Sequence, residues 1–474
     1  MNKEIITNNF ELKHKNYKLN NDICNDTQIC NKLLIRELYR LNLYNKLKKK
    51  LIDLSSEYII KNNIIIDNNK NEDNNTVNQN LLIEILTILI MELDKSEDPF
   101  FINKYPFDKE NLKNYIMKDR CFSMNKNSID VFLNIIPKLN EFYLDCYNNY
   151  NKFKNIILDI KYNINHIIES NIVEINLELD NEYINRLGID EIKYKNKIKL
   201  SSHIFNHLIK LYNTKVLNDY KSTEILDNLV IEYIYMLYMR YYVISSGNMQ
   251  ASVLPSFKKL LKERLNIKIE LFGSPLNTSM TNFGSIFYDI EWVFGSIGNY
   301  FDTNIIKGYY EANPPFDLCL IHKMFIKMSN ELDIAEKNKK PLLFFIIIPL
   351  SYTRTKKIPN EILPFVKYDK ILTKNNFPYI RYDREFLKTN VSAITDTNIL
   401  ICHTSYINSI YISFVQNFNT IIKKWSSGNI NKNIKSQKIN TKTNIKNETN
   451  IKNEINTNDT YNSKKSYRIL KKNI

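Results

Sequence analysis

The chain has 474 residues, enough for two or three domains, and its 43% hydrophobic and 12% aromatic residues exclude a fully disordered protein. Its net charge of +15 suits a polyanionic partner such as nucleic acid, and a lysine-rich composition that only favours solubility is the alternative. The longest apolar runs, such as LLFFIIIPL, are too short to span a bilayer, and the six cysteines form no CxxC pair, so we expect no membrane span and no metal site.

The two ends of the chain and its first half differ in amino-acid composition and in the spacing of apolar residues. Residues 1–30 are polar and rich in asparagine, and we expect disorder there. From residue 31 to about residue 255, apolar residues recur at spacings of three and four, which predicts a mostly helical domain with room for an inserted strand pair within residues 171–208. After Gly428 a low-complexity tract carries eleven Lys or Arg and three Asp or Glu, which predicts a disordered basic tail over residues 429–474.

Residues 256–428 form a second predicted domain. Five of the eight glycines of the chain fall between Gly273 and Gly308, where backbone can approach a ligand closely. Helical and strand patterns alternate here, which predicts a parallel α/β sheet that binds ligands at the carboxyl ends of its strands. The predicted helices are 255–266 and 317–337, and the predicted strands are 267–273, 307–312, 341–349, 377–383 and 397–405.

The segment EANPPF places a stiff, polar turn at the end of a predicted strand. An exocyclic amine of a nucleobase is a weak nucleophile, because its lone pair is delocalised into the ring. The Asn313 side-chain oxygen and the Pro314 carbonyl could each accept a hydrogen bond from one N–H group of this amine. Together they would draw the nitrogen towards tetrahedral geometry. Phe316 could stack on the base, so the motif predicts catalysis by orientation and electrostatic stabilisation. A tight turn that only caps a helix is the alternative.

An Asn-Pro-Pro-aromatic motif resembles the amino-methyltransferase signature, and its surroundings narrow the resemblance. ELFGSPLN, FGSIG, EANPPF and PLLFFIIIP occur in this order. Together they resemble the cap-specific adenosine-N6 methyltransferase family, also called the phosphorylated CTD-interacting factor family. The clear resemblance covers about residues 266–350 and extends faintly to residue 405.

The resemblance implies a Rossmann-like methyltransferase domain, preceded by a mostly α-helical domain, that uses S-adenosyl-L-methionine. It implies methylation of N6 of 2′-O-methyladenosine next to the m7G cap of mRNA, with capped mRNA as partner and the nucleus as location. The residues that would form the catalytic pocket are Asn313, Pro314, Pro315 and Phe316. Those that would bind the cofactor are Phe272, Ser274, Pro275, Leu276, Asn277, Gly295, Ser296, Asp302 and Glu311, with Asp289 as a weaker candidate. Substrate-binding candidates are Arg36, Arg40, Arg120, Tyr352 and Arg381.

Some residues depart from the family pattern. The family has acidic residues soon after the motif, whereas Asp317 is followed by Leu318, and Pro-Glu-Trp after the apolar strand is replaced by Pro349-Leu350-Ser351. Trp292 and Trp425 are far apart, so we expect no WW domain and infer no binding to a phosphorylated polymerase tail, although transcription machinery remains a candidate partner. The alternatives are methylation of internal adenines in RNA or DNA, and a catalytically silent homologue that only binds RNA or transcription machinery.

Overall fold

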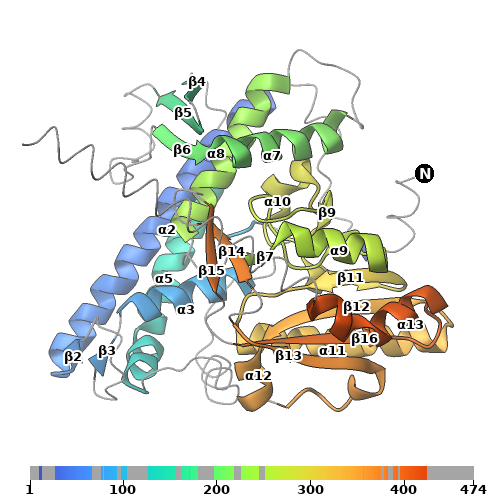
Figure 1. The fold of residues 1–474 in the computed structure, drawn as a ribbon. Coiled ribbons are helices and arrows are strands. Elements are labelled where there is room, and N and C mark those ends of the chain that lie inside the picture. The colour runs from blue at the N-terminus through green and yellow to red at the C-terminus, as the bar shows by residue number, and fades with distance from the viewer. Residues whose placement is uncertain are drawn as a thin grey trace, which may run out of the picture. The chain divides into compact units, whose positions relative to one another are not determined.

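A computed structural model provides the fold, drawn in Figure 1. It describes residues 10–12, 27–66, 76–77, 79–92, 98–103, 126–154, 162–169, 171–179, 197–217, 226–244, 251–355, 357–374, 378–382, 388–392 and 396–423. Residues Met1–Gln416 form one compact unit and Asn417–Ile474 a second one. Within the described ranges, no helix is long and apolar enough to cross a membrane.

Five α-helices lie in the described part of residues 27–244. They are α2 (Thr27–Lys61), α3 (Gln79–Glu92), α5 (Lys126–Lys154), α7 (Ser202–Tyr212) and α8 (Leu226–Ile244), with a π-helix at Asn213–Leu217. The apolar residues of α2, such as Leu34, Leu38 and Leu41, recur at spacings of three and four and are fully buried in one core with the other helices. The helical periodicity of this region is therefore confirmed in the described residues.

A small sheet interrupts these helices, and it has three strands where the sequence suggested a strand pair. They are β4 (Tyr162–Glu169), β5 (Ile172–Leu179) and β6 (Lys197–Ser201), antiparallel in the order β4-β5-β6. Alternate residues of β5, among them Val173, Ile175 and Leu177, are buried in the helical core. One face of the sheet therefore packs on the helices.

A six-stranded sheet with the order β13-β16-β12-β11-β8-β9 forms the second half of the unit. The strands are β8 (Ile269–Glu270), β9 (Asn282–Phe283), β11 (Gly308–Ala312), β12 (Leu342–Pro349), β13 (Val366–Leu372) and β16 (Thr397–His403). β16 runs antiparallel to both of its neighbours, whereas β12, β11, β8 and β9 are parallel. The sheet is therefore mixed, which corrects the expectation of a parallel sheet. An apolar run reads alike in either strand direction, so its pattern could not reveal the reversal.

Helices cover both faces of this sheet (Figure 1). The even-numbered side chains of β12, such as Phe344 and Ile346, pack in one core with α11 (Leu318–Lys337). On the opposite face Phe345 contacts Phe257 of α9 (Pro255–Leu265), and Tyr309 of β11 contacts Tyr411 of α13 (Ser409–Gln416). Burial on both faces explains why β12 is a continuous apolar run rather than an alternating one.

A second sheet carries β14, which the sequence suggested as a strand of the main sheet. It has the order β15-β14-β7, with β7 (Ala251–Val253), β14 (Pro378–Tyr382) and β15 (Lys388–Ser392) all antiparallel. The pairing of β14 with β7 joins segments that are more than a hundred residues apart in the chain. No local pattern could show this partner.

The remaining elements are short. They are β1 (Phe10–Leu12), β2 (Ile65–Ile66), β3 (Thr76–Val77), β10 (Thr303–Ile305), α10 (Tyr288–Glu291), α12 (Leu350–Thr355) and 3-10 turns at Trp292–Phe294, Tyr300–Asp302 and Leu363–Phe365. Because β1 pairs with β10 and α2 begins at Thr27, the expectation of disorder throughout residues 1–30 is wrong for these residues. The predicted tail at residues 429–474 lies outside the described residues, and the predicted domain boundary near residue 255 stays a prediction.

Candidate functional site

Two of the predicted motifs leave the same edge of the main sheet. β8 and β11 are parallel neighbours, with Glu311 in register with Glu270. The chain leaves β8 into Ser274–Asn277 and leaves β11 into Asn313–Phe316, so both segments follow carboxyl ends of adjacent strands. This placement confirms the expected position of both motifs, at the edge where open α/β sheets bind ligands.

The Asn-Pro-Pro-Phe segment is the turn from β11 to α11. The Asp317 amide donates to the Pro315 carbonyl over 2.7 Å, and the Asp317 side chain accepts from the Leu320 amide over 2.7 Å to cap α11. Asn313 is half-buried, and its Oδ1 atom is buried without a hydrogen-bond partner among the described residues. Buried acceptors in folded proteins are nearly always paired, so an orphaned amide oxygen here points to a donor supplied by a ligand.

Phe316 lies beside a residue that sequence reasoning missed. Its ring is 39% exposed and meets Tyr379 of β14 edge-on, at 6.1 Å between centroids and 84° between planes. Tyr379 is buried, and its hydroxyl lies 3.2 Å from Thr397 Oγ1 at the start of β16. Tyr379 therefore fixes one edge of Phe316 while part of the ring stays exposed. No signal in the sequence linked the two, because Tyr379 comes from a different sheet.

Three Phe-Gly-Ser segments lie side by side next to β8. They are residues 272–274, 283–285 and 294–296, an eleven-residue repeat that could have been found in the sequence. The Gly273 amide donates to the Gly284 carbonyl over 2.8 Å, and the Phe283 amide donates to the Gly295 carbonyl over 3.4 Å. A Cβ on Gly284 would lie 2.3 Å from the Leu271 carbonyl oxygen, so the segments approach as closely as glycine allows.

We call these three hydrogen-bonded segments the Phe-Gly-Ser ladder. The predicted cofactor residues Gly295 and Ser296 belong to it. Gly295 has φ +101°, and a Cβ there would lie 2.1 Å from the Thr281 carbonyl oxygen. The Ser296 hydroxyl lies 2.6 Å from the Ser285 hydroxyl and accepts from the Gly298 amide over 3.1 Å. Their contacts hold the ladder together, and cofactor binding by them stays a prediction.

The segment Ser274–Asn277 forms a compact turn. Asn277 Oδ1 accepts from the Ser274 amide over 2.9 Å, and the Thr278 amide donates to the Ser274 carbonyl over 2.9 Å. Ser274, Pro275 and Leu276 are buried. The cofactor-binding residues predicted here therefore shape the loop that follows β8.

The other predicted cofactor residues surround this loop. Phe272 contacts the rings of Tyr300 and Phe301 at 5.5 and 6.0 Å. Asp302 lies in the next 3-10 turn, where its amide donates to the Asn299 carbonyl over 3.0 Å. Glu311 is fully buried one residue before the end of β11, beside Glu270.

Glu270, Glu311 and Lys258 form what we call the acid-lysine cluster. The Lys258 ammonium, from α9, pairs with Glu270, and all three side chains are buried. Burial raises the pKa of Glu311 to about 8, Lys258 opposes this shift and the charge of Glu270 adds to it. In the described part of the chain, Oε1 of Glu270 and Oε1 of Glu311 have no hydrogen-bond partner.

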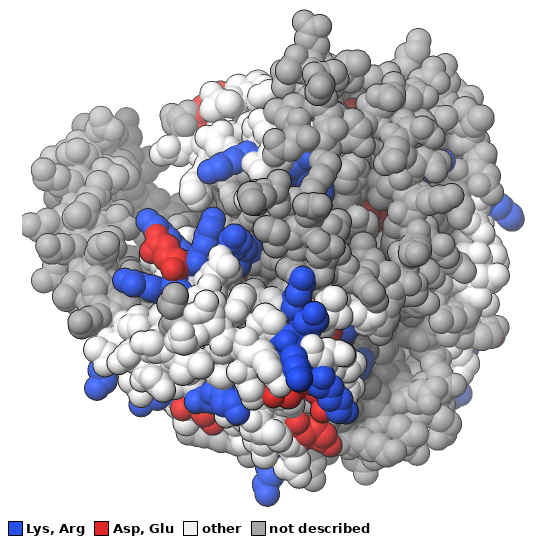
Figure 2. Space-filling model, turned by 90° about the vertical axis from the view of Figure 1, so that its right-hand side faces the viewer, with Lys and Arg blue, Asp and Glu red and all other residues white. Residues whose placement is uncertain are grey.

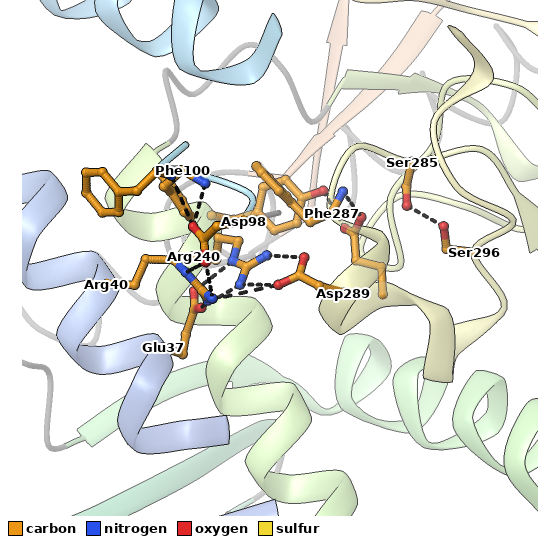
Figure 3. Close-up of polar contacts among 12 residues, drawn as sticks. Glu37, Arg40, Asp98, Phe100, Arg240, Ser285, Phe287, Asp289 and Ser296 are labelled. Carbon is orange, nitrogen blue, oxygen red and sulfur yellow. Dashed lines mark hydrogen bonds and ion pairs between the residues drawn. The ribbon is translucent and has the colours of Figure 1, made fainter. Parts of the chain in front are cut away.

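A second ionic group, the arginine cluster, joins the helices to the loops of the site (Figure 3). Arg240 of α8 donates to Asp289 of α10 over 2.6 and 2.8 Å and also pairs with Glu37 of α2. Arg40 pairs with Glu37, with Asp98 at 2.8 Å and with Asp289 at 3.9 Å. These contacts direct the Arg40 guanidinium at protein carboxylates and give no support to its predicted role on cap phosphates. Asp289 is likewise engaged with arginine.

Tyr352 does not lie where a substrate contact requires. Its side chain is fully buried in the core with α11, its hydroxyl lies 3.2 Å from His322 Nδ1, and its ring packs on Phe325. The position directly after a fully buried strand explains this, since the turn into α12 carries Tyr352 inward. These contacts give no support to the predicted substrate contact of Tyr352.

The remaining arginines give less information. The Arg36 side chain is half-buried in α2. Arg381 lies in β14, in register with Ala251 and Thr389, and its side chain is outside the described part. Arg120 lies outside the described residues altogether. On the face shown in Figure 2, Lys and Arg side chains gather in groups that adjoin Asp or Glu side chains.

The residues present fit a ligand that brings N–H donors to this edge. Glu270, Glu311 and Asn313 each carry a buried acceptor oxygen without a partner in the described part of the chain. S-adenosylmethionine carries a charged amino group, and an adenine base carries an exocyclic amine, so both groups would complement these acceptors. Among the described residues, no group of three or more His, Cys, Asp or Glu could hold a metal ion.

Comparison with known proteins supports the same region. Residues 207–379 match the family model described as phosphorylated CTD interacting factor 1 WW domain. Relatives from Homo sapiens and Mus musculus, both named mRNA (2'-O-methyladenosine-N(6)-)-methyltransferase, are each 28% identical over 165 residues, which are 33% of this chain and 22% of the relative. The chain thus matches less than a quarter of the length of these relatives. The matched segment contains one tryptophan, Trp292, and the absence of a WW domain stays a prediction.

Proposed function

We propose that this chain, which matches the phosphorylated CTD-interacting factor family over residues 207–379, methylates N6 of 2′-O-methyladenosine next to the m7G cap of mRNA. The observation that carries the proposal is the buried, unpartnered Oδ1 atom of Asn313 at the carboxyl end of β11. Two relatives whose names state methylation of N6 of 2′-O-methyladenosine in mRNA support it. The segment that matches the family contains Asn313 and Phe316.

Asn313 and the prolines would hold the amine to be methylated. The Asn313 Oδ1 atom would accept one N–H of N6 and the Pro314 carbonyl the other, which turns the nitrogen lone pair out of conjugation with the ring. Because each proline has a restricted φ, the turn loses little backbone conformational entropy when it is ordered. Both acceptors also stabilise the positive charge that develops on the nitrogen.

Phe316 would orient the adenine ring. It is the exposed aromatic residue of the turn, and Tyr379 limits the positions that its ring can adopt. Stacking on such a ring is worth about 1–3 kcal/mol per base. Since the base must be unstacked to reach Asn313, this contact replaces part of the lost base stacking.

S-adenosylmethionine would supply the electrophilic methyl group. The loop after β8 and the Phe-Gly-Ser ladder would hold it, because these segments lie at the same sheet edge as Asn313. Glu311 and Glu270 offer acceptors to its amino group.

Methyl transfer from labelled S-adenosylmethionine to a short RNA that begins m7GpppAm tests the proposal. Product nucleosides are identified by mass, and the same RNA without its cap is run in parallel with an Asn313→Ala protein. N6-methyl-2′-O-methyladenosine formed only on capped RNA, and lost in Asn313→Ala, is expected. Transfer to uncapped RNA or to DNA would favour internal adenines instead. No transfer together with no binding of S-adenosylhomocysteine would favour a silent homologue that only binds RNA.

A further inference from the structure

Glu270 and Glu311 project from the same face of the sheet. They are register partners on parallel neighbouring strands, and each side chain is 1% exposed. This face is the one that α9 covers, because Phe345, in register with Glu311, contacts Phe257 of α9. Lys258 follows Phe257, is 4% exposed and forms its ion pair with Glu270.

The arrangement leaves acceptors without donors. Burying a carboxylate costs free energy unless its oxygens receive hydrogen bonds or ion pairs. Oε1 of Glu270 and Oε1 of Glu311 lack them among the described residues, and Asn313, two residues after Glu311, presents a third orphaned oxygen. A Cβ on Gly273 would lie 2.2 Å from Oε1 of Glu270. Glycine at position 273 therefore leaves the space that this oxygen occupies. The orphaned oxygens point to a cationic donor that the described part of the chain does not supply.

The groups around Glu311 decide its charge. Burial raises the pKa of Glu311 to about 8, Lys258 lowers it and Glu270 raises it. Tyr379, from β14, also faces Glu311, and its own pKa is raised by burial and by this carboxylate. At neutral pH Glu311 therefore retains its proton, and Lys258 is the ion-pair partner of Glu270.

We propose that the acid-lysine cluster binds the positively charged amino group of the cofactor's methionine part and that Glu311 releases its proton when it does so. The proposal rests on the proposed function, since it takes S-adenosylmethionine as the ligand of this edge. Before binding, Glu311 carries a proton, and Lys258 forms an ion pair with Glu270. On binding, the incoming ammonium replaces the proton, which passes to the solvent, and both carboxylates are ionised. The charge within the buried site stays balanced throughout.

A pH dependence of cofactor affinity follows. A cation beside Glu311 favours its ionised form and lowers its pKa in the complex. Below the pKa of free Glu311, binding must therefore displace a proton, so affinity rises with pH by up to about tenfold per unit. Between about pH 5.5 and 7 the amino group of the ligand stays protonated, so it does not contribute to this change.

Calorimetric titration of the full chain with S-adenosylhomocysteine tests the proposal without any turnover. Titrations in two buffers of different ionisation enthalpy give the number of protons released. We expect release of close to one proton and an affinity that rises about three- to tenfold per unit between about pH 5.5 and 7. 5′-Methylthioadenosine, which lacks the amino-acid part, should bind without either effect.

Three variants separate the proposal from a general effect of pH. Glu311→Gln should bind S-adenosylhomocysteine with no proton release and no pH dependence. Lys258→Gln should keep the dependence and move it to higher pH, because the pair loses its counter-ion. Glu232→Gln, which removes a different buried carboxyl with a raised pKa, should behave as the wild type. Thermal unfolding checks that each variant is folded.

The outcomes are distinguishable. Binding of S-adenosylhomocysteine with no proton release, or with the same release in Glu311→Gln, overturns the proposed role of Glu311 and leaves the proposed function intact. Failure of the wild type to bind S-adenosylhomocysteine overturns both.

Discussion

Arg240, in α8, donates to both carboxylate oxygens of Asp289, in α10, over 2.6 and 2.8 Å. The Arg240 side chain is fully buried, and its guanidinium also lies over the rings of Phe100 and Phe287. One ion pair thereby ties the helices of the first half of the chain to the loops between the two motifs of the candidate site. The stability of these loops depends on residues distant in the sequence.

Asp289→Asn should lower the free energy of unfolding by about 3 kcal/mol, because it leaves a buried guanidinium with one carboxylate fewer. Urea denaturation followed by circular dichroism measures this loss. Asp333→Asn is the matched control, since Asp333 pairs with Lys337 over 2.6 Å on the surface, where such a pair is worth less than about 1 kcal/mol. Equal losses in the two variants would contradict a structural role for the arginine cluster.

Gly295→Ala should be strongly destabilising. Its φ of +101° disfavours a side chain, and the new Cβ would lie 2.1 Å from the Thr281 carbonyl oxygen, which is backbone and cannot move aside cheaply. We expect a loss of about 2–4 kcal/mol or failure to express as folded protein. Asn266→Gly, which places glycine at another left-handed residue, should change stability by less than about 1 kcal/mol. A Gly295→Ala protein as stable as the wild type would show that the Phe-Gly-Ser ladder is not packed as described.

Phe316→Ala should reduce kcat/KM for the RNA substrate by about 10- to 100-fold, which corresponds to the loss of one base-stacking contact. Affinity for S-adenosylhomocysteine should stay within about threefold, because the ring is predicted to contact the base and not the methionine part. Tyr406→Ala removes a similarly exposed aromatic residue just after the far end of β16 and should leave both quantities unchanged. An equal fall in both quantities for Phe316→Ala would argue that the ring supports the fold instead.

Glu232→Gln should make the protein more stable at pH 8. Burial raises the pKa of Glu232 from 4.5 to about 7 in the folded state, while a hydrogen bond from Tyr162 opposes this. The folded state thus holds a proton that the unfolded state has lost, so stability is complete below about pH 4.5 and falls by up to about 1.4 kcal/mol per unit as pH rises towards 7. Denaturation at pH 5, 6, 7 and 8 should give a flatter profile for Glu232→Gln, whereas the exposed Glu263→Gln should follow the wild type. Parallel profiles for wild type and Glu232→Gln would refute the raised pKa.

Much of the local structure follows from the sequence. The helices α9 and α11 and the strands β11, β12 and β16 lie within two residues of the predicted bounds. The same holds for the position of Asn313 at a strand end, because a buried apolar run followed by two prolines has few other conformations. The sequence also contained a signal that was not used, the recurrence of Phe-Gly-Ser every eleven residues.

Other features depend on contacts between distant segments. The reversed direction of β16, the pairing of β14 with β7 and the contact of Tyr379 with Phe316 have no local signature, since strand patterns are alike in every sheet and orientation. Arg40 and Tyr352 were predicted to contact a substrate, and only the structure shows that Arg40 pairs with Glu37 and Asp98 and that Tyr352 is buried against α11.

The sequence by itself determined the family resemblance, the turn at Asn313–Phe316 and the alternation of elements, because these depend on residue types and on spacings of a few residues. Only the tertiary structure decided which charged side chains are paired and which acceptors remain without partners. It brought Glu270, Glu311 and Lys258 together, although Glu311 is 41 residues from Glu270 in the chain. The reason is physical: charge, desolvation and hydrogen bonding depend on distances in space, and parallel strand pairing sets those distances without regard to separation along the chain.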